Sequence, residues 1–317
     1  MKNRNILVYL LSFFCLTSCY RVPDKIEPQV QYAVQDRHIQ SLPSPFSPLT
    51  AEEKKEAWGQ EYEIGLYFAK ELDLYRAITA FKRAEILLGN RSFLRKQEIE
   101  YNIILSYYLG NRYEEAIDAF SKSNLKEAND HFPAFHDLLV MLYESYVRTD
   151  KDAQAANILQ LMRKYYPKTA EQLRASSALL DGDLQKLESI ANAPPEKPYL
   201  EELLAFYKGK KKSISKAGLY NAVLPGAGYW YVGQKQSAIT AFLLNGAFIW
   251  ASYEFFSRGY TAAGIITTSF EVGWYFGGIY GAKESARFYN ERLFETNAAF
   301  VMRQQRLFPV LMLKYAF

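Results

Sequence analysis

The chain has 317 residues, of which 49% are hydrophobic and 23% are charged, and its formal net charge is +4 at pH 7. This balance is typical of a globular protein with an apolar core, and it excludes a disordered chain. Such a small net charge also argues against binding to nucleic acid, which requires a strongly basic surface.

An apolar run over residues 6–16 follows Lys2 and Arg4 and is followed by small residues and Cys19. The run is too short to cross a bilayer, which takes about 20 apolar residues in a helix. The order of charged, apolar and small residues predicts a secretory signal peptide over residues 1–18. The sequence Leu-Thr-Ser-Cys at 16–19 resembles the bacterial lipobox. This resemblance implies that Cys19 carries fatty acids such as palmitate and begins the mature chain, with an ordinary signal peptide or a short uncleaved anchor as the alternatives.

The next segment, residues 19–50, contains five prolines and shows no apolar period of a helix. This composition predicts a Pro-rich, semi-rigid tether between the lipid and the first domain. The alternative is that the segment packs along the surface of that domain. With Cys15 removed and Cys19 acylated, no thiol remains for a disulfide, so an exported fold would depend on packing alone.

A repeat with a step of 39 residues predicts pairs of helices between residues 58 and 167. Small residues and, four positions later, large apolar residues keep this step, at Ala77, Ala116 and Ala155 and at Phe81, Phe120 and Leu159. Residues at i and i+4 share one helix face, so a neighbouring helix can approach closely at each alanine. A degenerate fourth pair over 170–191, interrupted at 181–183, would cap the array, because each repeat buries its face only against a neighbour. An irregular helical bundle is the alternative.

The first repeat also places Gly65 at a small position on the preceding helix. This pattern resembles the tetratricopeptide repeat, a helix–turn–helix unit. The later repeats depart from it, with Ile104 and Tyr143 at the small position and a period longer than the family's, which is about 34 residues. The resemblance implies a repeat domain over 51–207 whose first helices line an apolar groove for a protein partner. The groove residues would be Tyr62, Leu66, Tyr101, Leu105, Tyr108, Val140 and Glu144.

Two apolar stretches follow, over residues 236–253 and 259–282, and the only charge in them is that of Glu271. Each is long enough to span a membrane, so we expect the two stretches to form a hydrophobic helical hairpin. Together with the basic linker before it, this hairpin makes up the region 208–295. A stripe of Gly273, Gly277 and Gly281 predicts close helix packing in lipid. A protonated Glu271 is expected to bond the amide of Asn245 at the same depth, since unpaired polar groups in hydrocarbon are costly. Proton or solute handling by Glu271 is the alternative.

Ahead of the hairpin, residues 224–233 read Leu-Pro-Gly-Ala-Gly-Tyr-Trp-Tyr-Val-Gly. They resemble the Leu-Pro-Gly-x-Gly-x-x-Tyr-x-Gly signature of small two-helix bacterial membrane domains, which implies membrane placement but no particular activity. Basic residues over 208–216 and 283–292 place both flanks in the cytoplasm by the positive-inside rule, whereas an exported lipoprotein with two spans has both flanks outside. Either residues 217–232 also cross or re-enter the membrane, or the helices lie against the outer membrane, or the signal is misread; we favour export.

The C-terminal tail, residues 296–317, ends with apolar residues at alternate positions. Such alternation resembles the last strand of an outer-membrane barrel, but no series of alternating strands precedes it. We therefore expect a single terminal segment that packs on the repeats.

Residues for catalysis are sparse. His131 and His136 are poorly spaced for a metal, and neither a phosphate-binding loop nor a nucleophile–base set is evident. We therefore predict no enzyme, no catalytic residue, no metal and no cofactor.

The sequence thus predicts an all-α protein with a helical-hairpin solenoid like that of the tetratricopeptide family, followed by a hydrophobic helical hairpin. As function we expect a membrane-anchored lipoprotein of the bacterial cell envelope, with periplasmic repeats that serve as a protein–protein scaffold in assembling an envelope complex. Its partners would be a protein and membrane lipid, without nucleic acid. The alternatives are a small transporter or channel component that uses Glu271, and an adaptor facing the cytosol on an uncleaved anchor.

Overall fold

The structure, a computed structural model, describes residues 25–30, 36–194 and 197–317. All regular structure in these ranges is helical, and no strand occurs in them, so the predicted all-α class is confirmed. The predicted signal peptide and Cys19 lie outside the described residues. The described residues form two compact units. The first, here called the repeat unit, lies within Val30–Lys197 and Ala298–Phe317; the second, here called the hairpin unit, contains residues 25–29 and Pro198–Asn297.

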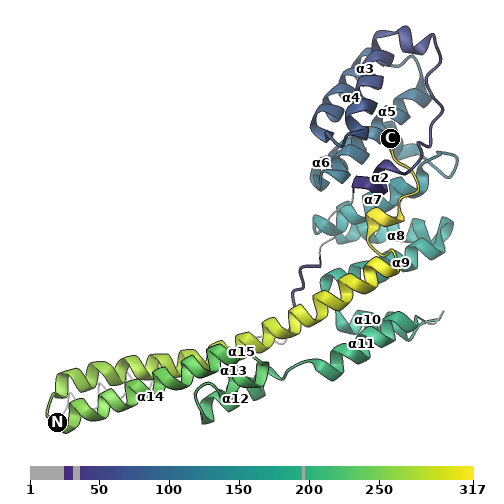
Figure 1. Ribbon diagram of the computed structural model, residues 1–317. Coiled ribbons are helices and arrows are strands. Elements are labelled where there is room, and N and C mark those ends of the chain that lie inside the picture. Colours follow the sequence, from purple (N-terminus) through teal and green to yellow (C-terminus); the bar gives the residue numbers. More distant parts are fainter. Residues whose placement is uncertain (1–24, 31–35, 195–196) are drawn as a thin grey trace. The chain divides into compact units, whose positions relative to one another are not determined.

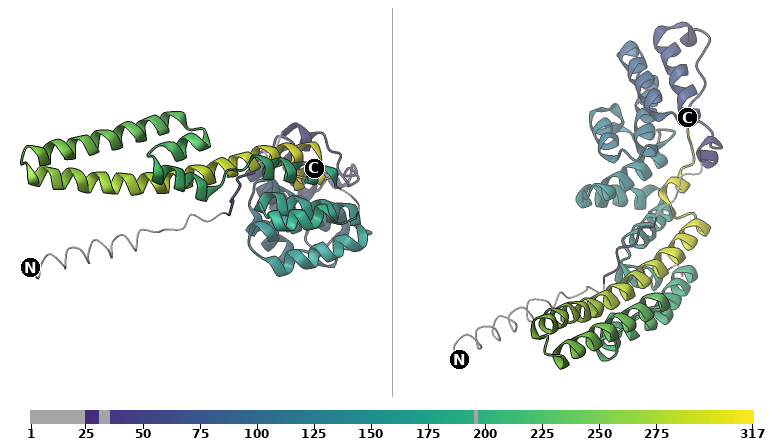
Figure 2. Two further views of the ribbon diagram at one scale, coloured as in Figure 1. Left: turned by 90° about the horizontal axis from the view of Figure 1, so that it is seen from below. Right: turned by 60° about the vertical axis from the view of Figure 1, so that its left-hand side comes forward.

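Four pairs of consecutive helices make up the repeat unit (Figures 1 and 2). They are α3 (Ala57–Lys70) and α4 (Leu74–Leu88), α5 (Phe93–Leu109) and α6 (Tyr113–Lys122), α7 (Phe135–Arg148) and α8 (Asp152–Tyr165), and α9 (Pro167–Asp181) and α10 (Leu184–Ala191). Short helices lie at Asp36–Gln40 (α2), Glu53–Lys55 (η1), Asn124–Glu127 (η2) and Pro309–Met312 (α16). From α3 to α10, each helix packs against the next one along the chain.

The turns inside these pairs share one backbone conformation. Helices α4, α6 and α8 begin at residues 74, 113 and 152, so the predicted step of 39 residues is preserved. Two positions before each start, Leu72, Asn111 and Asp150 have positive φ angles of 58°, 55° and 55°. In the fourth pair Gly182 has a φ of 64°, between α9 and α10. The predicted interruption of a fourth pair at residues 181–183 is therefore confirmed.

The core of the repeat unit forms where small residues let helices approach. Ala77 and Ala116 are fully buried, and Ala155 is 5% exposed. A Cβ atom added at Gly65 of α3 would lie 2.6 Å from the ring of Phe81 on α4, so the predicted close approach at Gly65 is present. Phe81 itself is fully buried, and its ring lies 5.6 Å from that of Tyr62.

The segment from residue 36 to residue 50 packs on the repeats. Ile39 and Leu49 are buried, and the ring of Phe46 meets that of Tyr101 edge-on at 5.6 Å. Arg95 of α5 donates hydrogen bonds to the carbonyl oxygens of Ser47 and Pro48. The prediction of a Pro-rich tether is therefore wrong for this segment, because its apolar side chains belong to the core of the repeats.

The hairpin unit contains α11 (Pro198–Lys210), α12 (Ile214–Val223), α13 (Ala227–Val232), α14 (Lys235–Ser257) and most of α15 (Thr261–Gln304). Helices α14 and α15 lie side by side and are joined by a three-residue turn in which Gly259 has a φ of 80° (Figures 1 and 2). Within the described residues, α14 alone is both long and apolar enough to cross a membrane, and only 6% of its most apolar window is buried. Its large apolar side chains, such as Trp250, face outward.

A small core joins the short helices of the hairpin unit to α15. Ala217 of α12, Val232 of α13 and Ala286 of α15 form its centre, with Tyr231 and Tyr289 packed against them. The predicted repeat domain extended to residue 207, whereas the contacts assign α11 to the hairpin unit. There the ring of Tyr207 packs edge-on against that of Phe294 at 5.6 Å.

Candidate functional site

The C-terminal segment, residues 313–317, is held inside the repeat unit. Leu313, Ala316 and Phe317 are 3%, 3% and 6% exposed, and they belong to the same apolar core as the repeat helices. The ring of Phe317 stacks on that of Phe81 with 6.3 Å between centroids and 19° between planes. The predicted packing of the tail on the repeats is therefore confirmed.

A buried carboxylate binds the backbone of this segment. Oδ2 of Asp137, on α7, accepts hydrogen bonds from the backbone N–H groups of Lys314 and Tyr315, both at 2.8 Å. Its Oδ1 lies 2.6 Å from Nδ1 of His136, whose Nε2 lies 3.0 Å from Oγ1 of Thr169. Asp137 is fully buried, so these hydrogen bonds replace those that water would make with an exposed carboxyl group.

The tail also pairs with the N-terminal side of the unit. The backbone N–H of Ala316 donates to the carbonyl oxygen of Pro43 at 3.0 Å. In addition, Nζ of Lys314 lies 5.4 Å from the centroid of the Tyr166 ring. The repeat unit thus holds its own residues 313–317 in three ways. It accepts hydrogen bonds from their backbone N–H groups, it stacks an aromatic ring on Phe317, and it makes a cation–π contact with Lys314.

The predicted groove residues lie in this core instead of lining an open groove. Six of them are less than 9% exposed, and Leu66 is half-buried: the six are Tyr62, Tyr101, Leu105, Tyr108, Val140 and Glu144. The expectation of an open, tyrosine-rich surface is therefore corrected. The physical reason is that these side chains pack between neighbouring repeat helices, as Tyr62 does on Glu98 and Tyr108 on Glu144. Residues 36–50 and 313–317 also contribute side chains to the same core, and Phe46 packs on Tyr101.

Two of the three tyrosines among them, Tyr62 and Tyr108, form hydrogen bonds between successive odd-numbered helices, whereas the buried hydroxyl of Tyr101 has no hydrogen-bond partner. The hydroxyl of Tyr62 donates to Oε1 of Glu98 at 2.5 Å, and that of Tyr108 donates to Oε2 of Glu144. Burial raises the pKa of Glu98 and of Glu144, while these hydrogen bonds act in the opposite direction. In contrast, hydrogen bonds from Arg95 lower the pKa of Glu53. These networks connect one helix pair to the next.

The predicted hydrogen bond between Asn245 and Glu271 does not form. Nδ2 of Asn245 donates instead to the carbonyl oxygen of Ala241, one turn earlier on α14, at 2.6 Å. Both residues are buried, and Oδ1 of Asn245 and Oε2 of Glu271 have no hydrogen-bond partner. The prediction is wrong because the amide donates to the backbone of its own helix and leaves its oxygen, like Oε2 of Glu271, without a partner.

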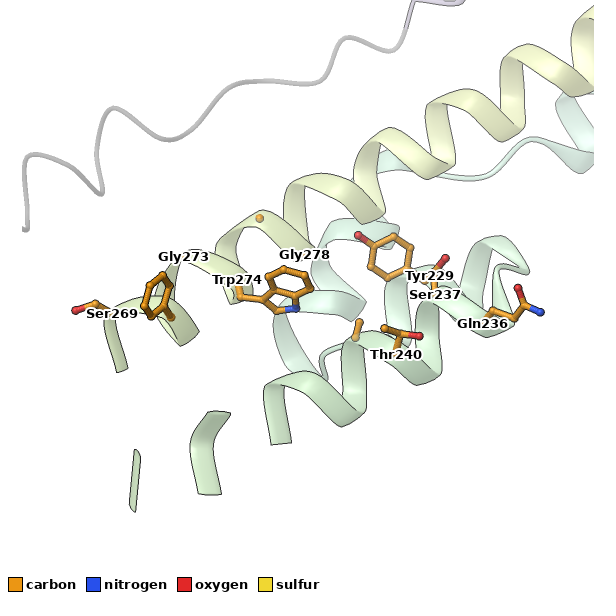
Figure 3. Close-up of a pocket in the computed structure, with 11 residues that line it drawn as sticks. Tyr229, Gln236, Ser237, Thr240, Ser269, Gly273, Trp274 and Gly278 are labelled. Atoms are coloured by element: carbon orange, nitrogen blue, oxygen red, sulfur yellow. The ribbon is translucent and has the colours of Figure 1, made fainter. Parts of the chain in front are cut away.

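The glycines of α15 do not form a single packing stripe either. A Cβ at Gly281 would overlap the hydroxyl of Tyr229 on α13, whereas a Cβ at Gly273 or Gly277 would meet nothing within 4 Å. The latter two glycines line a cleft of about 720 Å³ in the hairpin unit. Figure 3 shows Trp274 of α15 and Tyr229 in this space, with Thr240 on the facing side of α14. Within the predicted stripe, close packing thus occurs at Gly281 and not at Gly273 or Gly277.

Sequence reasoning missed Asp137, the residue that holds the tail. Its signal was present, because Asp137 opens the otherwise apolar run Asp-Leu-Leu-Val-Met-Leu on α7. An acidic residue on a buried face requires donors, and the tail provides two of them.

Comparison with models of protein families, with curated proteins and with solved structures finds no match to this chain.

Proposed function

We propose that this protein is a membrane-anchored lipoprotein of the bacterial cell envelope whose helical repeats serve as a scaffold for other polypeptides. Cys19 would carry the lipid, and the repeats, which resemble tetratricopeptide repeats in a solenoid, would face the periplasm. The task we infer is to assemble or organise an envelope complex. Helices α14 and α15 would form a hydrophobic hairpin in the membrane.

The observation that carries this proposal is the bound tail. Residues 313–317 are extended, and their backbone is recognised by Asp137 while Phe317 occupies an aromatic site on Phe81. Such a combination of backbone hydrogen bonds and a side-chain site is how extended peptides are recognised in general. The site therefore suits a partner segment of similar character, an extended chain with an aromatic residue, which would compete with the tail.

The shared turns support a repeat scaffold. Three turns have a residue of positive φ at equivalent positions, 39 residues apart, and a fourth turn has such a residue at Gly182, so successive helix pairs are joined by similar turns. The exposed apolar surface of α14 supports the membrane role, because large apolar side chains such as Trp250 would be poorly hydrated in water.

Binding of the tail peptide to the full chain without residues 313–317 tests the scaffold. A fluorescently labelled peptide of sequence Leu-Lys-Tyr-Ala-Phe should bind the shortened chain and leave the intact chain unlabelled, because the intact chain fills its own site. Changing Asp137→Asn in the shortened chain should weaken the binding. A shortened chain that keeps its helical content but shows no saturable binding would contradict the proposal.

A photo-crosslinking residue in place of Tyr166, which contacts Lys314, would find the partner in intact cell envelopes. The matched control replaces Tyr75, which is 77% exposed and lies on α4. A partner captured from position 166 and not from position 75 would identify the competitor for the tail. Mass spectrometry of the mature protein tests the anchor, since we expect an acylated Cys19 as its first residue.

A transporter or channel component is the second candidate, and one observation favours it. Glu271 is 9% exposed on an apolar stretch of α15, and its Oε2 has no partner. Unpaired carboxyl groups inside membranes often serve ion or proton pathways. Replacing Glu271 by Gln should abolish transport by such a component, whereas a scaffold would bind the tail peptide as before.

A further inference from the structure

We propose that α12 and α13 form a half-membrane hairpin, which enters one leaflet of a bilayer beside α14 and α15 and returns to the side from which it came. Its partner is lipid, with acyl chains around the turn between the two helices and anionic headgroups around the lysines at its base. This inference rests on the proposed membrane role of α14 and α15.

The start of α12 is fixed near Asn290 of α15. Oδ1 of Asn290 accepts from the backbone N–H of Lys212 at 2.7 Å, and its Nδ2 donates to the carbonyl oxygen of Lys212 at 2.9 Å. The far end of α12 is fixed near Tyr275, whose hydroxyl donates to the carbonyl oxygen of Ala222. Because a helix rises by about 1.5 Å per residue, these two anchor points on α15 are about 22 Å apart. Helix α12 therefore runs along α15 towards the α14–α15 turn and stops well short of it.

Helix α13 brings the chain back. Oε1 of Gln234, which follows α13, accepts a hydrogen bond from Oγ of Ser285 on α15 at 3.3 Å. Ser285 lies ten residues from Tyr275, which corresponds to about 15 Å of helix, or half the thickness of the hydrocarbon layer. Both ends of the α12–α13 pair thus lie near the same end of the α14–α15 pair. The turn between them, where Gly226 meets Ala238 three residues after the start of α14, stays within one leaflet.

The backbone of this turn is satisfied by protein, as any irregular chain inside hydrocarbon must be. The N–H of Gly226 donates to Oδ1 of Asn221 at 2.9 Å, and the N–H of Ala227 donates to the carbonyl oxygen of Leu224 at 2.9 Å. Pro225 has no N–H to satisfy. The exposed end of α12 therefore leaves few polar groups that require water.

The glycines of the motif permit this close crossing. Gly226 has a φ of 92°, and a Cβ there would overlap the carbonyl oxygen of Ala238 on α14. A Cβ at Gly228 would overlap the carbonyl oxygen of Ala217 and the side chain of Ala282. The Leu-Pro-Gly-x-Gly pattern is thus explained by packing of α12, α13, α14 and α15 against one another.

The outer surface of the α12–α13 pair is apolar near the turn and charged at the base, as one leaflet of a bilayer requires. Leu219, Val223 and Leu224 are 60%, 77% and 50% exposed, and no charged residue occurs from residue 217 to residue 234. Charges gather at the base, where Lys210, Lys211, Lys216 and Lys235 are exposed. Lysines at this level complement anionic headgroups, while the apolar turn complements the acyl chains.

Thiol labelling of the full chain in native membranes tests the path of the chain. Single substitutions Lys210→Cys, Val223→Cys, Lys235→Cys and Arg258→Cys would be treated with a membrane-impermeant maleimide before and after permeabilisation, with the unsubstituted chain as the background. We expect positions 210 and 235 to react from one side, position 258 to react from the other, and position 223 to react only in detergent.

The outcomes separate this inference from the proposed membrane role. Labelling of positions 210 and 235 from opposite sides would mean that residues 217–232 cross the membrane, and rapid labelling of position 223 would mean that the turn is in water; either result overturns the half-membrane hairpin while α14 and α15 still cross. Labelling of position 258 from the same side as position 235 would instead overturn the crossing by α14 and α15.

Lipid titration tests the headgroup contact. Energy transfer from tryptophan to dansyl-labelled phosphatidylglycerol would be measured for the full chain in detergent micelles, with dansyl-labelled phosphatidylcholine for comparison. The change K210Q/K211Q should weaken the response to phosphatidylglycerol roughly tenfold. The matched control K126Q/K168Q, which removes the same charge from the repeat unit, should leave it unchanged; an equal response in both variants would refute the role of the basic cluster.

Discussion

The repeat unit and the hairpin unit place their large apolar side chains in opposite ways. In the repeat unit, Phe81 and Tyr101 are fully buried, whereas in the hairpin unit Ile249 and Trp250 of α14 are 58% and 67% exposed. Glycines differ similarly, since Gly65 is covered by the ring of Phe81 while Gly273 faces open space. The two units therefore suit different surroundings. The repeat unit buries its large apolar side chains in its own core, whereas the hairpin unit, as we propose, exposes its apolar surface to lipid.

The largest effect that would distinguish the units is expected from a deleted aromatic ring. Phe81→Ala should lower the free energy of unfolding by about 3–5 kcal/mol, because the ring fills the space between α3, α4 and the tail. Thermal and urea unfolding of the full chain in detergent would measure it. The matched change Phe242→Ala, at a residue of α14 that is 54% exposed, should shift the same transition only slightly.

A smaller loss is expected at the carboxylate that binds the tail. Asp137→Ala leaves the N–H groups of Lys314 and Tyr315 without their acceptor, which should cost about 2–3 kcal/mol and release residues 313–317. Hydrogen exchange at these residues would detect the release. Asp118→Ala removes an exposed ion pair with Lys122 and is expected to leave the tail protected; unchanged exchange in both variants would contradict the assigned role of Asp137.

Within the hairpin unit, the two kinds of glycine should respond differently. Gly228→Ala places a methyl group against Ala217 and Ala282 and should destabilise the unit by about 1–2 kcal/mol. Gly273→Ala fills open space and should be tolerated. Resistance of the hairpin unit to proteolysis in detergent would compare them, and equal sensitivity of the two variants would show that the crossing at Gly228 is not tight.

The smallest expected effect is a pH dependence within the repeat unit. Because burial raises the pKa of Glu144 above its ordinary value of 4.5, the folded chain holds a proton there that the unfolded chain releases. Protonated Glu144 therefore contributes its full stabilisation of the folded chain below about pH 4.5. This stabilisation is lost as the pH rises through the pKa of Glu144 in the folded state.

The free energy of unfolding measured from pH 4.5 to pH 7 would reveal this contribution as a downward slope. Glu144→Gln should make this slope shallower, since the amide does not titrate. The slope that remains would come from Glu98 and Glu100, whose pKa values are also raised by burial. An unchanged slope in this variant would show that Glu144 does not titrate in that range.

Local patterns predicted the helices well, but they did not predict their contacts. The step that joins Ala77, Ala116 and Ala155 predicted helices α4, α6 and α8 and their buried faces, because helical periodicity depends on residues that are close in sequence. The apolar stretches likewise predicted α14 and the first part of α15. The interaction of Asn245 with its own helix was not predicted, since depth along a helix does not determine the direction of an amide.

By itself, the sequence determined the all-α class, the 39-residue step, the apolar helix α14 and the packing of the tail on the repeats. Only the tertiary structure decided which surfaces stay open. The tail reaches Asp137 across more than 170 positions in the chain, and residues 36–50 contribute apolar side chains to the same core from the N-terminal side. Such contacts depend on complementary shape and on hydrogen bonds between distant segments, and neither has a local period that a single sequence would reveal.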